Sequence, residues 1–235
     1  MDVAFAQDSG VIVGLSQRND GSMIWGNRLP VDETVRANRD RFFIEKGIDP
    51  SRVIAGGVVH GTDVARVSDK EAGQYLLNID ALVTNIPNLF LSITAADCMP
   101  LYFYDPCTHS IGIAHAGWRG MVGGAIENII NALQKTLQAK NSEIQVIIGP
   151  HIRSCHFEVL ENVALEFQAQ SVERRDGKLF VSLAHEATTR LTTLGISQIV
   201  QSSQCTYCQA ATFYSARHDR SNPLQGMAAY IGLKN

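Results

Sequence analysis

The sequence predicts a mixed α/β or α+β protein, in which helices pack against mixed β-sheets. Short runs of β-branched and aromatic residues recur along the chain, and segments with helical spacing lie between some of them. The two kinds of segment do not alternate strictly, whereas a doubly wound parallel sheet would require such alternation. No repeat or linker divides the chain, so we expect one domain over residues 1–235.

The strand segments are short apolar runs bounded by turn-forming residues. They are Val11–Leu15, Val53–His60, Leu89–Thr94, Leu101–Tyr104, Ser110–His115, Gln145–Ile148, Ser197–Val200 and Met227–Ile231. Several of them end beside glycine or another small residue. Ligands often bind where the strands of an open sheet end, because the loops there are free to shape a pocket.

Helical spacing is clearest over Gly123–Ala139, where five apolar residues form one stripe: Ile126, Ile129, Ile130, Leu133 and Leu137. Asn162–Gln170 and Leu183–Leu194 predict two more helices, and Gly195 suits the end of the second. Arg36–Lys46 mixes two phenylalanines with charged residues, which predicts an amphipathic surface helix whose basic side chains face water.

The composition excludes several classes of protein. Hydrophobic residues make up 45% of the 235 residues and charged residues 18%, which favours a packed core over disorder. The net charge of −3 gives no reason to expect nucleic acid or a membrane surface as a partner. The opening residues, MDVAFAQDSG, lack the features of a secretory signal. Five cysteines, an odd number, predict reduced thiols and a cytoplasmic protein.

Three segments place a reactive side chain where a strand ends: His60 in VIAGGVVHGTDV, Cys98 in LFLSITAADCMPLYFYDP, and His115 in SIGIAHAGWRGMVGG. Two imidazoles and a thiolate suit zinc or copper. Three protein donors would leave one position of a tetrahedral ion for water or substrate, as in catalytic sites. The spacing of the three residues matches no short metal motif, and a cysteine of this kind is often simply buried.

The chain also resembles the YfiH/YlmD family of laccase-domain proteins, described as multicopper polyphenol oxidases and as purine nucleoside phosphorylases. The resemblance extends from about position 16 to position 233 and rests on the segments VVHG, DALVTN, ADCMPLYFYD, AHAGWRG, IGPHIRSCHFEV, CTYC and FYSAR. It implies that His60, Cys98 and His115 bind a metal, usually zinc, with copper as the alternative ion. The implied fold is a layered α/β/β/α sandwich with mixed sheets, which is shared with bacterial toxin deamidases.

The implied activity is that of a zinc-dependent transferase and hydrolase. It would split adenosine, inosine and methylthioadenosine with phosphate into a free base and ribose 1-phosphate, and would also deaminate adenosine. We expect purine nucleosides and phosphate as small-molecule partners, and a monomer. Copper-dependent phenol oxidation would be a side reaction, because seven scattered histidines without an HxH pair are too few for a multicopper oxidase.

Phosphorolysis needs an anion site, and arginine suits phosphate through its planar fork of donors. Arg119 follows a strand-to-helix turn and is the first candidate, followed by Arg18 and Arg217. Trp118 could stack on a purine or serve packing. Family members usually carry an arginine and paired glycines where this chain has QRNDG, a different segment where it has GNRLPVDE, and Gly-Arg where it has Gly226-Met227.

Asp97 precedes Cys98 and has three possible roles: it could orient a ligand histidine, act as a general acid or base, or make a structural hydrogen bond. Cys205 and Cys208 form half of a structural zinc motif, a redox pair or two buried thiols, and Cys155-His156 or His218 could contribute further ligands. His151 is a candidate for the pocket mouth.

Two alternative functions use the same residues. A thiol hydrolase or deamidase would use Cys98 as nucleophile and His115 as base, although His60 is then unneeded. The other alternative is a non-catalytic member of the family that only binds a ligand.

Overall fold

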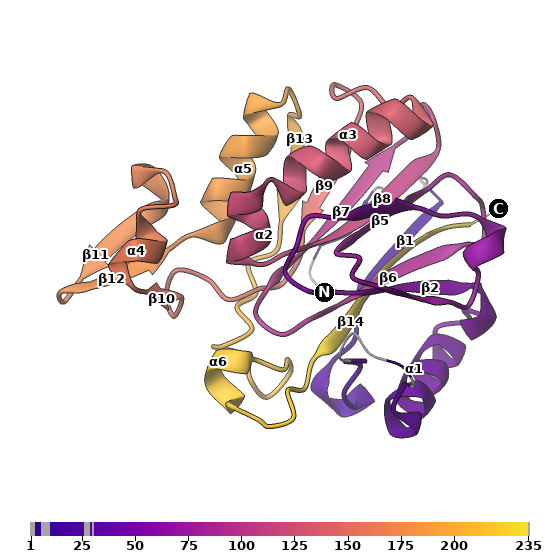
Figure 1. Cartoon of the computed structure of the whole chain (residues 1–235), viewed down its shortest axis with the longest axis horizontal. Coiled ribbons are helices and arrows are strands. Elements are labelled where there is room, and N and C mark those ends of the chain that lie inside the picture. Colours follow the sequence, from indigo (N-terminus) through magenta and orange to yellow (C-terminus); the bar gives the residue numbers. More distant parts are fainter. Residues whose placement is uncertain (1–2, 6–9, 26–28, 30, 235) are drawn as a thin grey trace.

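The computed structural model describes residues 3–5, 10–25, 29 and 31–234. Parts of the opening MDVAFAQDSG and of the GNRLPVDE segment therefore lie outside the described residues. Two large sheets are stacked between helices (Figure 1). Both sheets contain parallel and antiparallel neighbours, so the predicted α/β/β/α sandwich with mixed sheets is confirmed.

The five-stranded sheet has the order β1-β14-β6-β2-β4. Its strands are β1 (Val11–Leu15), β14 (Met227–Leu233), β6 (Phe90–Ala95), β2 (Val53–Gly57) and β4 (Tyr75–Leu77). The first three are antiparallel neighbours, and β6, β2 and β4 run parallel to one another. Segments near the two ends of the chain thus pair with each other in one sheet.

The six-stranded sheet has the order β13-β9-β7-β8-β5-β3. Its strands are β13 (Gln198–Gln201), β9 (Gln145–Ile148), β7 (Met99–Asp105), β8 (Ser110–Ala116), β5 (Ala81–Thr84) and β3 (Val64–Arg66). The four central strands are antiparallel, and a parallel pair lies at each edge.

Helices cover the outer faces of both sheets (Figure 1). They are α1 (Glu33–Glu45), α2 (Trp118–Gly123), α3 (Ala125–Leu137) and α5 (Leu183–Thr193). The apolar stripe of α3 packs on the six-stranded sheet, while Phe42 and Phe43 of α1 pack on the five-stranded sheet. Between the sheets, Leu91 and Ile93 of β6 share a fully buried cluster with Tyr102 of β7.

A smaller part of the chain lies to one side of the two stacked sheets (Figure 1). It contains a three-stranded sheet of order β10-β12-β11 and the short helix α4, while the short helix α6 lies below them in this view. Their bounds are β10 (Glu158–Val159), β11 (Val172–Arg175), β12 (Lys178–Val181), α4 (Glu161–Ala164) and α6 (Ala216–Asp219). The sequence signals did not predict these short strands, nor β3, β4 and β5.

Three sequence predictions need correction. The strand predicted to reach His60 ends at Gly57. The helix predicted from Gly123 begins at Ala125, because Gly124 takes the left-handed conformation (φ +95°) and separates α2 from α3. The helix predicted over Asn162–Gln170 is wrong, since α4 lasts a single turn. The chain leaves the helix after Ala164, and the backbone N–H of Gln168 donates to the Glu186 carboxylate at 3.3 Å.

The prediction for Arg36–Lys46 holds for the helix but fails for one of its basic residues. Arg39 is 3% exposed, and its guanidinium donates to Ser92 Oγ at 2.9 Å and to the Met23 carbonyl at 3.2 Å. It also lies 4.5 Å above the Trp25 ring. A buried arginine needs such partners because an unpaired charge in a protein interior is costly.

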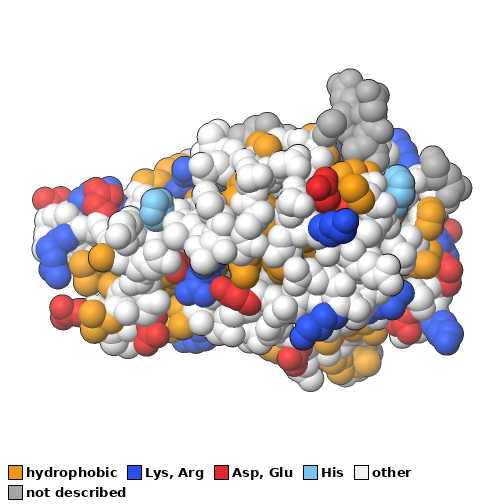
Figure 2. Space-filling model, turned by 90° about the horizontal axis from the view of Figure 1, so that it is seen from above, with side chains coloured by type: hydrophobic (Ala, Val, Ile, Leu, Met, Phe, Trp, Pro, Cys, Tyr) orange, Lys and Arg blue, Asp and Glu red, His pale blue; other side chains and the backbone are white. Residues whose placement is uncertain are grey.

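Charge is dispersed on the surface of the molecule. On the face drawn in Figure 2, Lys and Arg side chains are interspersed with Asp and Glu, which agrees with the small net charge of −3. Within the described part of the chain, no helix is long and apolar enough to cross a membrane.

Candidate metal centre

The structure brings together His60, Cys98 and His115, which lie far apart in the sequence. One donor atom of each lies within 4.8 Å of the other two. The two imidazole rings meet edge to face, with centroids 4.9 Å apart. The side chains form a gradient of exposure, since His60 is exposed, Cys98 is half-buried and His115 is buried.

The site forms where the chain crosses between the two large sheets. His60 follows β2 of the five-stranded sheet and precedes β3 of the six-stranded sheet. Cys98 lies in the bend that joins β6 of the first sheet to β7 of the second, and His115 lies near the end of β8. Two crossings and one strand end therefore place the three donors at the same edge of the sandwich.

Gly117 leaves the space that the donor atoms need. A Cβ at this position would lie 2.8 Å from Cys98 Sγ and 3.1 Å from His60 Cδ2. Real Cβ atoms essentially never come within 3.0 Å of another heavy atom, so the contact with Cys98 Sγ would force a shift. The backbone of Gly117 is extended (φ −71°), so its small size rather than its flexibility matters here.

Asp80 contacts two of the three donor residues, His60 and His115, on the side away from the cavity wall. Its carboxylate lies 3.1 Å from His115 Nδ1 and accepts backbone N–H groups of His60 and Gly61, each at 2.9 Å. The side chain is 1% exposed. With Nδ1 facing this carboxylate, His115 has Nε2 available as a donor atom. Carboxylates in this position orient metal-binding histidines. Asp80 was not among the candidates predicted from sequence, although a carboxylate directly before the buried run Ala81–Thr84 was the available signal.

The electrostatics favour a thiolate at Cys98. Burial alone would raise the pKa of this thiol, but His115 and His60 together lower it below its ordinary value. Burial would lower the pKa of His115, whereas Cys98 and Asp80 raise it. The thiolate is the form of cysteine that binds metals.

These residues fit a metal ion with an open coordination position. Two imidazoles and a thiolate match the donor types of zinc and copper sites. The Asp80 carboxylate faces His115, and Gly117 leaves space for the donor atoms, so the surrounding residues also suit a bound ion. The described residues therefore support a metal centre, and the donor set leaves open whether the ion is zinc or copper.

A cavity of about 780 Å³ opens beside the three donors. Its aromatic wall contains Trp25 and Tyr75, whose rings meet edge to face at 4.5 Å. Polar groups of α1 and of the segment before β14 also line it, namely Asp32, Thr34, Asn38, Asn222 and Gln225. Among the described residues that line this cavity, none is a lysine or an arginine.

Asp97 faces away from the donor atoms. Thr206 donates to its Oδ1 at 2.6 Å, and the backbone N–H of Arg217 donates to its Oδ2 at 2.8 Å. The residue is 6% exposed and has φ +80°. Of the roles considered from sequence, these contacts match the structural hydrogen bond, and Asp80 occupies the place behind His115.

The arginines chosen as anion-binding candidates lie elsewhere. Arg18 pairs with Asp219 at 2.6 Å. Arg119 is exposed and stacks over Trp118 at 4.3 Å. Arg217 lines a different cavity together with Trp118. The structure thus places none of these four candidates in the wall of the cavity beside Cys98.

His151 was expected at the pocket mouth, but it is fully buried. Its Nδ1 lies 2.8 Å from the Gly149 carbonyl, and its backbone forms a parallel bridge with Cys205. These contacts give His151 a structural role, because they hold the segment after β9 against the segment after β13.

Comparison with known proteins agrees with this geometry. Residues 14–234 match the family described as multi-copper polyphenol oxidoreductase laccase. The chain is 29% identical to the purine nucleoside phosphorylase YlmD of Geobacillus stearothermophilus, covering 96% of this chain and 91% of that protein. It is 30% identical to the purine nucleoside phosphorylase YfiH of Escherichia coli, covering 85% and 81%.

A solved structure, that of the hypothetical protein YfiH of Bacillus licheniformis, superposes with a TM-score of 0.88. It is 28% identical to this chain, and the match covers 97% of this chain and 94% of that one. The sequence match, the shared fold and the donor cluster at the edge of the sandwich agree with one another. The chain belongs to the laccase-like YfiH/YlmD family.

Proposed function

We propose that this protein is a zinc-dependent purine nucleoside phosphorylase that acts on adenosine, inosine and methylthioadenosine and also deaminates adenosine. The observation that carries the proposal is the convergence of His60, Cys98 and His115, braced by Asp80, on a cavity of about 780 Å³. Relatives named purine nucleoside phosphorylase, at about 30% identity over most of the chain, support the same reaction class.

In phosphorolysis, the bond between the base nitrogen and C1′ of the ribose breaks. A phosphate oxygen forms the new bond to C1′, and the proton that hydrogen phosphate loses is transferred to the nitrogen of the leaving base. Phosphorolysis involves no oxidation or reduction, so an ion without redox chemistry, such as zinc, is sufficient. When bound, zinc would supply a Lewis acid that polarises an oxygen of the substrate.

The protein itself orients the donor side chains and leaves space beside them. Asp80 fixes the ring of His115, and Gly117 keeps the approach to Cys98 open. Asp97 enters this proposal as a positioning residue, because its two carboxylate oxygens hold other segments of the chain.

Trp25 is the aromatic residue that we propose to contact the purine, in place of Trp118. It lines the cavity that contains Cys98. Its indole Nε1 is buried and has no hydrogen-bond partner among the described residues. A buried donor without a partner is unfavourable, and a ring nitrogen of a bound base would satisfy it.

The test is a product assay with the purified zinc-loaded protein. Inosine with phosphate should yield hypoxanthine and ribose 1-phosphate, and adenosine without phosphate should yield inosine and ammonia. Cys98→Ala should abolish both reactions. Cys107→Ala should preserve them, because Cys107 is an exposed thiol between β7 and β8. Wild-type protein that forms no product above a blank with zinc present would refute the proposal.

A second candidate function is favoured by the arrangement of Cys98, His115 and Asp80. A thiolate beside an imidazole that faces a carboxylate is also the arrangement of a thiol hydrolase or deamidase. The two proposals differ in what zinc does to Cys98. Iodoacetamide that modifies Cys98 in the zinc-loaded protein would support the thiol enzyme, whereas protection of Cys98 by zinc would support the metal enzyme.

A further inference from the structure

A second cluster of soft donors lies apart from the first. Cys155 and His156 lie in the turn before β10, and Cys205 and Cys208 lie in the turns after β13. One donor atom of each residue lies within 4.8 Å of the other three. Cys205 is buried and the other three are exposed. The proposed phosphorolysis uses none of them.

Four of the six distances within this cluster are close to the edges of a tetrahedron around a metal ion, and the other two are no longer than 4.8 Å. Cys155 Sγ lies 3.7 Å from Cys205 Sγ and 3.6 Å from Cys208 Sγ. His156 Nδ1 lies 3.3 Å from Cys155 Sγ and 3.3 Å from Cys208 Sγ. Zinc binds sulfur at about 2.3 Å and nitrogen at about 2.0–2.1 Å, which gives tetrahedral edges of about 3.8 Å between sulfurs and about 3.6 Å between sulfur and nitrogen. The sulfurs lie well beyond the S–S distance of about 2.05 Å in a disulfide.

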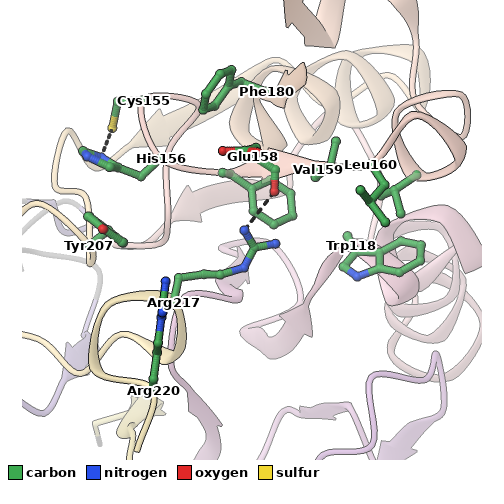
Figure 3. Close-up of a pocket in the computed structure, with 12 residues that line it drawn as sticks. Trp118, Cys155, His156, Glu158, Val159, Leu160, Phe180, Tyr207, Arg217 and Arg220 are labelled. Carbon is green, nitrogen blue, oxygen red and sulfur yellow. Dashed lines mark hydrogen bonds between the residues drawn. The ribbon is translucent and has the colours of Figure 1, made fainter. Parts of the chain in front are cut away.

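Contacts outside the cluster hold the two turns together. The backbone of His151 bridges to Cys205, and Thr206 N donates to the His151 carbonyl at 3.1 Å. The His156 ring stacks on Tyr207 with centroids 4.0 Å apart and planes at 14°. Stacking fixes the plane of the imidazole. Figure 3 shows Cys155, His156 and Tyr207 together at one end of a cavity, with Arg217 and Glu158 further along its wall.

We propose that Cys155, His156, Cys205 and Cys208 bind a zinc ion as a closed structural site. Three thiolates and one imidazole form one of the usual donor sets of structural zinc, and four protein donors leave no position for substrate. The site would fasten the turn after β13 to the turn before β10. The sequence contains the pair Cys205 and Cys208 at the usual spacing, but the other two ligands lie about 50 residues earlier.

The second site also reaches the first one through hydrogen bonds. Thr206 lies between the two cysteines of the later turn, and its hydroxyl donates to Asp97 at 2.6 Å. Asp97 directly precedes Cys98. Zinc in the second site would therefore stabilise the bend that carries Cys98.

The decisive experiment counts zinc in full-length protein whose first site has been removed by Cys98→Ser. This background separates the inference from the proposed function, since no activity is measured. The Cys98→Ser protein should retain about one zinc ion per chain. Adding Cys155→Ser and Cys208→Ser should remove it, whereas adding Cys107→Ser, which changes another exposed thiol, should not. Equal zinc content with and without Cys155→Ser and Cys208→Ser would overturn the proposal.

The absorption spectrum of bound Co²⁺ reports the coordination geometry of the site. In the Cys98→Ser protein, Co²⁺ should produce the intense thiolate charge-transfer bands and visible bands of a tetrahedral site, and Zn²⁺ should displace them. The spectrum of octahedral cobalt would contradict the proposal.

A readout on the unmutated chain covers the case in which the variants do not fold. Cys155 and Cys208 are exposed, yet bound zinc should protect them from iodoacetamide until a chelator is added. Cys107 should react both with and without the chelator and serves as the internal control. Labelling of Cys155 and Cys208 before chelation would refute the site. A mass lowered by two hydrogens in protein denatured without reductant would instead identify a disulfide and would also refute it.

Discussion

Asp80→Asn tests whether the carboxylate behind His115 supports metal binding. The native carboxylate accepts backbone N–H groups of His60 and Gly61 and faces His115 Nδ1. In the variant, one oxygen becomes an amide nitrogen. Placed at the Oδ2 position, it faces the N–H of Gly61. Placed at the Oδ1 position, it faces the N–H of His60 and leaves His115 without its acceptor.

Both orientations of the amide have a cost. A buried N–H without an acceptor should lower the free energy of unfolding by about 1–3 kcal/mol. Loss of a carboxylate that orients a ligand histidine typically weakens metal binding by about 10–100-fold. That loss corresponds to about 1.4–2.8 kcal/mol of binding free energy. We therefore expect both a moderate loss of stability in the metal-free protein and a separate loss of zinc affinity.

The two losses are measured by urea unfolding of metal-free protein and by zinc titration against a competing chelator. Asp63→Asn is the matched control, because it removes the same charge from an exposed side chain near the site. It should leave both quantities unchanged within error. Zinc affinity of Asp80→Asn within twofold of the wild type would refute the role assigned to this carboxylate.

Three further predictions each concern one residue. Gly117→Ala places a Cβ 2.8 Å from Cys98 Sγ and should weaken zinc binding at least tenfold. Gly123→Ala is the control and should leave zinc binding unchanged. Competition with a chelator measures both affinities, and equal values would contradict the steric argument. Burial lowers the pKa of His151 to about 4, so its contribution to stability is present above pH 6.5 and lost as the pH falls through about 4. Between pH 6.5 and about 4, the free energy of unfolding of the wild type should therefore fall by about 3 kcal/mol more than that of His151→Gln. Urea unfolding measures both values, and an equal fall in the two proteins would rule this out. Tyr102→Phe removes a 3.0 Å hydrogen bond to a carbonyl of β1 and should lower the free energy of unfolding by about 1 kcal/mol; an unchanged urea midpoint would argue against that bond.

The long, strongly patterned segments of the chain are predictable from sequence. The stripe of α3 shows the helical period because one face of the helix packs against the core. The strands β7 and β8 are instead buried along their whole length, so their signal is a short buried run bounded by turn residues. Short edge strands such as β3 and β4 have only three residues each, too few to show a period. Their pairing partners decide their conformation, and a single sequence does not contain that information.

The helix expected over Asn162–Gln170 shows that a local pattern can also predict an element that does not form. Its apolar residues have approximate helical spacing, but Leu165 is 80% exposed. The backbone of Gln168 bonds to Glu186, which lies on another helix. Tertiary contact thus overrides the local preference.

The first metal centre could be predicted as a set of residue types at strand ends, but not as a geometry. His60 and Cys98 both lie where the chain passes from one sheet to the other, and the sequence contains no sign of which strands belong to which sheet. The same is true of Asp80, which directly precedes β5 and faces His115 of the neighbouring strand β8. Arginines suggested an anion site by their chemistry alone, yet Arg18 is engaged by Asp219.

The second cluster shows why spacing rules find half of such a site. Cys205 and Cys208 lie in one turn, so their separation is a local property that the sequence displays. Cys155 and His156 reach them only because the segment after β9 pairs with the segment after β13, as the parallel bridge from His151 to Cys205 shows. That pairing follows β9 and β13 beyond the end of the sheet, with the register shifted by one residue. The two halves of the donor set are therefore brought together by the pairing of these two segments, which the spacing of the cysteines in the sequence does not display.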